Sequence, residues 1–236
     1  MISYSEIKAS VILPVFNKAA VLPQVLENLE RILLEYSFQW KFIIVNDGSS
    51  DGFEQLKLSK SIYQVCNLEQ NGGKGGAIKE GLKHCTSSNF VILFDADLDI
   101  DPECLPRMID SIVNGRCDIA ITSKLHPESN VNYPWIRKIL SYGYYFFVKT
   151  LFGLNVKDTQ TGAKIFNNDS IGCMQDNQQE GFVFDLESLI RAKKRRLRVE
   201  QYPVTINMID NSTVGVEDII KMIVATLRLK VRHNEN

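Results

Sequence analysis

Two aspartates, Asp95 and Asp97, directly follow the apolar run 90–94. Because side chains alternate along a strand, this spacing presents two carboxylates side by side where a buried strand ends. Mg²⁺ and Mn²⁺ prefer such oxygen ligands and usually keep waters and substrate phosphates in their remaining positions. The pair therefore predicts a site for a metal diphosphate, and the alternative is an acidic strand end that only starts a turn.

Two more aspartates, Asp99 and Asp101, continue this acidic stretch. Asp101 precedes Pro102, which is typical of a helix start with aspartate as the cap and proline at the first helical position. We therefore expect Asp101 to cap a helix. Asp99 fits either a structural role or a metal-binding one, and it is the third candidate ligand after Asp95 and Asp97.

The elements that must position these residues follow a repeating pattern in the first half of the chain. Short apolar runs lie at 9–15, 41–45, 62–66, 90–94 and 118–122, and amphipathic segments lie at 21–36, 53–60, 75–85 and 102–114. Strand–helix alternation of this kind predicts an α/β fold with a mainly parallel sheet covered by helices. After about residue 123 the pattern changes to an aromatic-rich helical segment, 134–152, a polar turn and mixed elements.

The composition indicates one ordinary globular domain. The chain has 236 residues, of which 44% are hydrophobic and 23% charged, and its net charge of -1 gives no general argument for nucleic-acid binding. Its five cysteines include no Cys-x-x-Cys pair, which favours reduced thiols in a cytosol-facing protein. The start of the chain lacks a signal-peptide pattern and the uncharged stretch 139–148 is too short to span a bilayer, so we expect any membrane contact to be peripheral.

Three polar segments fall at predicted strand ends, at 14–17, 46–51 and 95–99. Ligands of open α/β sheets bind beyond the carboxyl ends of the strands, so these segments should converge. Asp47 begins either a tight turn or a site for a base or ribose. The glycine-rich segment 71–77 precedes a helix, so its amides and Lys74 can face a diphosphate, although it lacks P-loop spacing.

The order of these segments resembles family 2 glycosyltransferases of the GT-A fold, through 11–17, 43–52, 71–77 and 94–97. Within that family, 158–166 and 182–187 look like the dolichyl-phosphate mannose and glucose synthase branch, and the resemblance runs from about Ser10 to Val204. It implies a single GT-A domain over 1–236, in which 1–123 binds the nucleotide sugar and 124–236 binds the acceptor and ends in an amphipathic helix.

The activity implied by the resemblance is inverting transfer of a hexose from a UDP or GDP sugar to polyprenyl phosphate. The implied location is cytoplasmic, at the inner face of the membrane. Asp95 and Asp97 then hold Mg²⁺ or Mn²⁺, with Asp97 counted as catalytic. The residues implied to bind the donor are Pro14, Val15, Asn17, Asp47, Lys74 and Asp95, and those implied to bind the acceptor or a phosphate are Lys124, Arg137, Ser141, Gln160 and Lys164.

The chain departs from the family pattern at three positions. Lys18 stands where an acidic residue is usual, Asn46 replaces the first aspartate of a paired-acid motif, and Lys124 stands where Ser-Arg is expected. Lys124 keeps the positive charge but lacks the bidentate fork of arginine, so it should hold a phosphate with less directional control. These departures also motivate a different hypothesis, a non-catalytic nucleotide-binding subunit that recruits a partner.

The acceptor determines whether the enzyme needs a base. A phosphate monoester, with a second pKa of about 6, is largely dianionic near neutral pH and can attack unaided. A saccharide hydroxyl, the acceptor in an alternative role in polysaccharide synthesis, needs an aspartate to take its proton, and Asp158 and Asp185 are the candidates. With a phosphate acceptor, the same aspartates would instead orient Lys164, Arg137 or the donor sugar.

Three segments are candidates for membrane contact, and one of them is the basic run 191–198, for which a solvated helix end is the alternative. The aromatic concentration within 135–152 suits a membrane interface, with core packing as the alternative for about half of its members. The last helix carries an apolar stripe, Val216, Ile219, Ile220, Ile223, Val224 and Leu227, beside basic residues. This helix is expected either to lie on the membrane or to close the fold.

Overall fold

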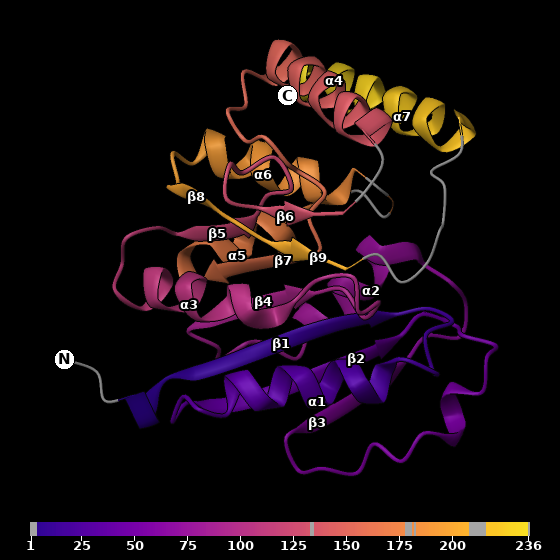
Figure 1. The fold of residues 1–236 in the computed structure, drawn as a ribbon, viewed down its shortest axis with the longest axis vertical. Helices are drawn as coiled ribbons and strands as arrows, with labels where there is room; N and C mark the ends of the chain where they lie inside the picture. The colour runs from indigo at the N-terminus through magenta and orange to yellow at the C-terminus, as the bar shows by residue number, and fades with distance from the viewer. Residues whose placement is uncertain (1–3, 133–134, 178–180, 182, 208–215, 236) are drawn as a thin grey trace.

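The computed structural model describes residues 4–132, 135–177, 181, 183–207 and 216–235, without the side chains of 135–137, 216–219 and 234–235. A seven-stranded sheet with the order β3-β2-β1-β4-β7-β5-β8 forms its centre (Figure 1). The strands are β1 (Lys8–Val15), β2 (Gln39–Asn46), β3 (Tyr63–Asn67), β4 (Phe90–Phe94), β5 (Ile119–Thr122), β7 (Ala163–Asn167) and β8 (Val199–Tyr202). A separate parallel pair joins β6 (Asn130–Val131) to β9 (Thr205–Ile206).

The sheet is mainly parallel, as predicted, and β7 is its antiparallel member. β7 pairs with β4 on one side and with β5 on the other. Its first residue, Ala163, lies opposite Phe94, the last residue of β4. The turn that precedes β7 is therefore brought beside Asp95, whose backbone N–H donates to the Gly162 carbonyl at 2.9 Å.

Helices cover both faces of the sheet, because successive strand residues point to opposite sides. Val11 and Leu13 of β1 face one core with α1 (Leu22–Leu33) and α3 (Leu105–Val113). Ile12 faces the other core with α2 (Gly73–Leu82), α5 (Asn168–Gln175) and α6 (Phe184–Lys194). The buried side chains of α1 are Leu22, Val25, Leu26, Leu29, Ile32 and Leu33.

Local capping explains where two of the helical elements begin. Asp101 accepts a hydrogen bond from the Glu103 N–H at 3.0 Å, and Pro102 opens a 3₁₀ turn, Pro102–Cys104, which leads into α3. The capping role expected for Asp101 is confirmed. Asn167, the last residue of β7, caps α5 by accepting from the Ser170 N–H at 3.0 Å.

The prediction of a helix over 53–60 was wrong. Only a 3₁₀ turn, Phe53–Gln55, forms there, and it ends at Leu56, whose own backbone is extended. Leu56 and Leu58 both pack against the core that Phe53 enters. The Leu58 N–H donates to the Leu56 carbonyl at 3.1 Å, so a tight turn brings both side chains to the core and the segment does not continue as a helix.

The last helical layer consists of α4 (Trp135–Phe152) and α7 (Val216–Glu235), which lie side by side at the top of Figure 1. The Tyr144 hydroxyl and the Thr226 hydroxyl are 3.0 Å apart, and the Lys230 ammonium lies 5.6 Å from the centre of the Phe152 ring. Val148 and Leu229 anchor the two helices in the core. Within the described residues, no helix combines the length and apolar character needed to cross a bilayer.

Candidate active site

The acidic pair lies where the sequence predicts it, directly after β4. Asp95 and Asp97 line a cavity of about 350 Å³, and Asp99 lines the same cavity. The Asp97 carboxylate accepts a hydrogen bond from the Asp99 N–H at 3.1 Å, which forms a local turn. The metal and turn interpretations are therefore compatible, because one oxygen of Asp97 can stabilise the turn while the other stays available.

Gly162 lets the turn before β7 approach Asp95 closely. A Cβ atom on Gly162 would lie 2.6 Å from Asp95 Oδ2 and 2.7 Å from Ile100 Cδ1. Both distances are far below ordinary contact, so any side chain here would push the carboxylate from its position. Only glycine fits at position 162 while Asp95 keeps its present position.

Four charged side chains of alternating sign, beginning with Asp95, extend from the cavity into the protein interior. Lys74 Nζ lies 2.7 Å from Asp95 Oδ1 and 3.6 Å from Asp185 Oδ2. Lys164 Nζ lies 3.1 Å from Asp185 Oδ2 and donates to the Thr161 carbonyl. Lys164 is 2% exposed, so its charge is compensated almost entirely by these partners.

The pKa shifts of this network follow from burial and from its alternating charges. Burial raises the pKa of Asp185, but the ammonium groups of Lys164 and Lys74 outweigh it, and the net pKa lies below the usual range. Burial lowers the pKa of Lys164, and Asp185 offsets only part of that shift. For Lys74, Asp95 and Asp185 outweigh burial and raise the pKa. Asp185 therefore stays ionised and holds a proton poorly.

The acidic pair itself carries negative charge that nearby cations do not fully offset. Burial, together with the neighbouring carboxylates of Asp95 and Asp99, raises the pKa of Asp97 to about 6. A divalent cation would relieve this repulsion, and the oxygen donors present suit Mg²⁺ or Mn²⁺. The described residues contain no group of three or more His, Cys, Asp or Glu side chains placed to hold a metal, so phosphates and waters would have to complete its coordination.

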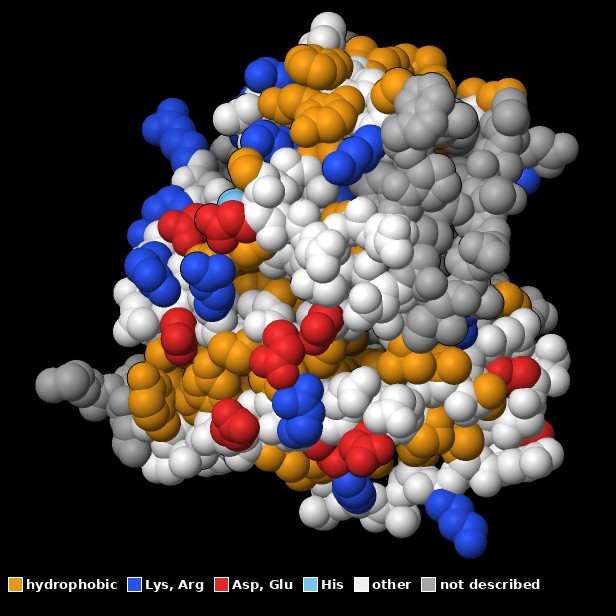
Figure 2. Space-filling view, in the orientation of Figure 1, with side chains coloured by type: hydrophobic (Ala, Val, Ile, Leu, Met, Phe, Trp, Pro, Cys, Tyr) orange, Lys and Arg blue, Asp and Glu red, His pale blue; other side chains and the backbone are white. Residues whose placement is uncertain are grey.

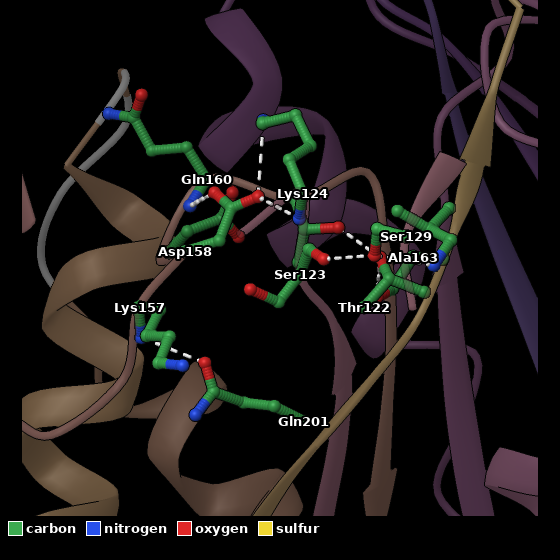
Figure 3. Close-up of polar contacts among 12 residues, drawn as sticks. Thr122, Ser123, Lys124, Ser129, Lys157, Asp158, Gln160, Ala163 and Gln201 are labelled. Carbon is green, nitrogen blue, oxygen red and sulfur yellow. Dashed lines mark hydrogen bonds and ion pairs between the residues drawn. The ribbon is translucent and has the colours of Figure 1, made fainter. Parts of the chain in front are cut away.

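A separate ion pair in the cavity lining joins Lys124 to Asp158, the first residue of the 158–166 motif. Lys124 Nζ lies 3.3 Å from Asp158 Oδ2, and the same oxygen accepts from the Lys124 N–H at 3.0 Å. The other oxygen of Asp158 accepts from the Gln160 N–H at 3.3 Å. Figure 3 shows the Lys124 side chain turned toward Asp158. Asp158 therefore orients Lys124, whereas the groups named from the sequence for such a role were Lys164, Arg137 and the donor sugar.

The loops after β1 and β2 support each other at the expected nucleoside end. Asn17, whose φ is +51°, accepts from the Ser50 N–H at 2.9 Å. Asp47 is 3% exposed and accepts from the Gly72 N–H at 2.7 Å, which ties the β2 loop to the glycine-rich segment. The Asn46 side-chain oxygen accepts a hydrogen bond from the Ser49 N–H at 3.0 Å. Asn46, which departs from the family pattern, therefore still stabilises the turn.

The predicted site residues fall into two groups. Those that line the cavity are Asp95, Asp97, Asp99, Lys124, Ser141, Asp158 and Gln160. Those outside its lining are Pro14, Val15, Asn17, Asp47, Lys74, Lys164 and Asp185. The Val15 side chain is wholly buried in the core, so its part in binding a nucleoside could come only from its backbone. The Arg137 side chain lies outside the described part of the chain.

Several residues that line the cavity were not predicted as site residues from the sequence. They are Ile100, Lys157, Thr159, Thr161, Gly162 and Ile206, with Leu140 and Tyr144 from α4 and Met222 from α7. Met222 does not belong to the apolar stripe that the sequence suggested for the last helix. A second apolar face at helical spacing, Met222, Ala225 and Leu229, was the available signal, because a helix with two apolar faces contacts more than one partner.

Comparison with known proteins gives one family match and many relatives. The family model described as Glycosyl transferase family 2 matches residues 10–174. The dolichyl-phosphate beta-glucosyltransferase of Saccharomyces cerevisiae is 32% identical over 243 residues, covering 92% of this chain and 72% of the yeast protein. The protein of the same name from Dictyostelium discoideum is 30% identical over 247 residues, covering 97% of this chain and 75% of its own length.

The fold also matches solved structures. Glucosyl-3-phosphoglycerate synthase from Mycobacterium tuberculosis, solved with Mn²⁺, UDP and glucosyl-3-phosphoglycerate, superposes with a TM-score of 0.72 at 17% identity. The match covers 95% of this chain and 80% of the synthase. At this identity the likeness concerns the fold, and it confirms the GT-A architecture expected from the sequence.

Proposed function

Because the chain belongs to glycosyl transferase family 2, we propose that it transfers glucose from UDP-glucose to a polyprenyl phosphate such as dolichyl phosphate. The names of the yeast and Dictyostelium relatives support glucose as the sugar and dolichyl phosphate as the acceptor. The UDP and Mn²⁺ bound by the mycobacterial synthase support the donor nucleotide and a divalent cation. We place the reaction at the cytosolic face of a membrane, with the protein bound peripherally.

One observation favours a phosphate acceptor in particular. Asp158 and Asp185, the two candidates for a base, each contact a lysine, at 3.3 Å to Lys124 and 3.1 Å to Lys164. Because its pKa lies below the usual range, Asp185 is poorly suited to accept a proton from a hydroxyl. A phosphate dianion needs no such base, so this arrangement suits the acceptor that can attack unaided.

The residues have distinct roles in this proposal. Asp95 and Asp97 hold the divalent cation, which offsets the charge that builds on the departing diphosphate. Lys74, at the start of α2 and 2.7 Å from Asp95, adds positive charge on the donor side. Lys124 and Ser141 line the cavity on the acceptor side, where their ammonium and hydroxyl groups can bind the acceptor phosphate. Attack by a phosphate oxygen opposite the leaving diphosphate inverts the anomeric carbon.

The direct test uses a panel of donors and acceptors. Radiolabelled UDP-glucose, UDP-galactose and GDP-mannose are each incubated with polyprenyl phosphate, polyprenol or an oligosaccharide, and the products are extracted into organic solvent. We expect label in the organic phase with UDP-glucose and polyprenyl phosphate. Label that reaches only the oligosaccharide would instead support polysaccharide synthesis.

The partner-recruiting alternative predicts a different result from the same sample. A ligand that binds only the native state raises the melting temperature. UDP with Mn²⁺ should stabilise the protein under either hypothesis, but a recruiting subunit would show this stabilisation with no transfer to any acceptor in the panel. That combination would reject the proposed activity and keep the nucleotide site.

A further inference from the structure

Within the described part of the chain, two lysines line the cavity, and only one of them is paired. Lys124 Nζ lies 3.3 Å from Asp158 Oδ2, so a neighbouring carboxylate already offsets its charge. Lys157 also lines the cavity, but its ammonium forms no ion pair with any described residue. Lys157 therefore offers the cavity a positive charge that no described carboxylate offsets.

The backbone of Lys157 is fixed, although its side chain is exposed. Its neighbours in the chain, Val156 and Asp158, are both buried. The Lys157 N–H donates to the Gln201 side-chain oxygen at 2.8 Å, as Figure 3 shows. Gln201 belongs to β8, which pairs in parallel with β5, the strand that ends shortly before Lys124. Lys157 and Lys124 therefore enter the cavity from the same end of the sheet.

The other walls of the cavity bring no further cation from the described residues. The wall formed by α4 and α7 is uncharged and consists of Leu140, Ser141, Tyr144 and Met222. Hydrophobic side chains also gather on the outer surface of these two helices, at the top of Figure 2. The wall after β4 carries only negative charge, from Asp95, Asp97 and Asp99. An anion that does not bind the metal is therefore attracted to the side of Lys124 and Lys157.

A phosphate on this side needs more positive charge than the Lys124 pair supplies. The acceptor phosphate, with a second pKa of about 6, is largely dianionic near neutral pH. Lys124 and Asp158 together carry no net charge. Lys157 directly precedes Asp158 in the chain, so its ammonium adds positive charge beside that pair. A lysine ammonium is a compact charge with three rotatable donors, which suits phosphate oxygens.

We propose that Lys157 binds the acceptor phosphate together with Lys124, and that Gln201 is a positioning residue that holds Lys157 through its backbone. This inference rests on the proposed function and adds a phosphate-binding residue to its acceptor site. The donor diphosphate has similar chemistry, but its place in the proposed function is beside the metal at Asp95 and Asp97. Lys157 should therefore affect the acceptor and not the donor.

The first experiment measures the KM of farnesyl phosphate and of UDP-glucose in the presence of Mn²⁺. Lys157→Met should raise the KM of farnesyl phosphate about fivefold or more, because a charge-assisted contact is lost, and leave the KM of UDP-glucose within about twofold of wild type. Lys157→Arg keeps the charge and should restore most of the acceptor KM. Added salt should raise the acceptor KM of the wild type more than that of Lys157→Met, because ions screen the contact.

Lys8→Met is the matched control, because Lys8 is an exposed lysine at the start of β1 that does not line the cavity. It should keep both wild-type KM values. The inference is rejected if Lys157→Met also keeps the acceptor KM, or if it raises the KM of UDP-glucose instead. Folding of each variant is checked by the stabilisation that UDP with Mn²⁺ produces.

The role of Gln201 is tested in two backgrounds. Gln201→Met should raise the acceptor KM about threefold in the otherwise wild-type protein, but change it little in Lys157→Met, because its effect acts through the Lys157 side chain. An equal rise in both backgrounds would reject the positioning role.

A last experiment reads out binding without turnover. Calorimetry measures the affinity of the full chain for farnesyl phosphate and for farnesol without a donor. Lys157→Met should weaken the binding of farnesyl phosphate about fivefold or more and leave that of farnesol unchanged. This result without any glucosyl transfer by the wild type would keep the phosphate contact and reject the proposed reaction. Transfer by the wild type with unchanged farnesyl phosphate binding in Lys157→Met would keep the reaction and reject the inference.

Discussion

Lys164 shows how tightly charge is balanced next to the predicted metal site. It is 2% exposed and pairs with Asp185, which in turn lies near Lys74 and, through it, Asp95. A buried ion pair is expensive to desolvate, and it becomes strongly destabilising when one partner is removed. The network therefore fixes the relative positions of β7, α6, α2 and the end of β4 at the site.

Replacing Lys164 by Met should lower the free energy of unfolding by about 3 kcal/mol, because Asp185 would lose its closest cation inside the protein. Urea denaturation at pH 7 measures the change. The double variant Lys164→Met with Asp185→Leu should recover part of the loss, because no lone buried carboxylate remains.

Lys83→Met is the control for this prediction. Lys83 forms an ion pair with Glu80 at 2.6 Å, but its side chain is 68% exposed. Its replacement should change stability by less than about 1 kcal/mol. An equal loss in Lys83→Met and Lys164→Met would show that the buried pair has no special role.

Gly162 gives a second prediction at the residue scale. In Gly162→Ala the new Cβ would displace Asp95, since it would lie 2.6 Å from Asp95 Oδ2. We expect the affinity for Mn²⁺ with UDP, measured by calorimetry, to fall at least tenfold. Gly143→Ala is the matched control, because a Cβ at Gly143 on α4 meets nothing within 4 Å and Gly143 lies outside the cavity lining, so this variant should bind like the wild type. Unchanged binding in Gly162→Ala would show that Gly162 is not needed to position Asp95 for metal binding.

Among the elements, the sheet is tied together at the edge opposite the site by Asp118. Its carboxylate accepts from the Arg198 N–H at 2.8 Å and pairs with the Arg198 guanidinium at 2.9 Å. It also accepts from the Asn167 side chain at 3.3 Å. One aspartate thus connects the starts of β5 and β8 with the end of β7, the strands that carry the second half of the chain into the sheet.

Asp118→Asn should lower stability in a pH-dependent way. Hydrogen bonds from Arg198 hold the pKa of Asp118 below its ordinary value of 3.8, despite partial burial. A carboxyl group whose pKa is lower in the folded than in the unfolded state stabilises the folded protein at any pH above its unfolded pKa. This stabilisation is lost as the pH falls through the pKa of the folded state. The urea midpoint of Asp118→Asn should be lower than that of the wild type, and this difference should be largest at pH 7 and shrink below about pH 4.

The control for this prediction is Glu35→Gln, which removes an exposed carboxylate elsewhere. Its effect on the midpoint should be small at pH 7 and at pH 3. A difference for Asp118→Asn that stayed constant down to pH 3 would assign the loss to packing and not to the charged contact.

For the molecule as a whole, the sequence predicted the features that depend on local pattern. Strand–helix alternation gave the mainly parallel sheet, and the end of β4 placed Asp95 and Asp97 at its edge. The helix cap at Asp101 was also readable, because it needs only one residue and the proline after it. The predicted division at residue 123 stays a prediction, and both halves contribute strands to one sheet.

Features that depend on distant contacts were not predictable in this way. The pair of Lys74 and Asp95 joins α2 to the end of β4, and the pair of Lys164 and Asp185 joins β7 to α6, so both depend on the tertiary fold. The turn from Leu56 to Leu58 depends on the core that both side chains reach. Met222 lines the cavity because α7 packs on α4, a contact that no local pattern specifies.

The central claim is that the carboxylates after β4 support glucosyl transfer to a lipid phosphate. The most direct measurement extracts radiolabelled lipid after incubation of wild type and Asp97→Asn with UDP-glucose, polyprenyl phosphate and Mn²⁺, with and without a chelator. We predict labelled lipid from the wild type with Mn²⁺ only, and at least a hundredfold less from Asp97→Asn. Transfer by Asp97→Asn at the wild-type rate, or no labelled lipid from the wild type, would contradict the claim.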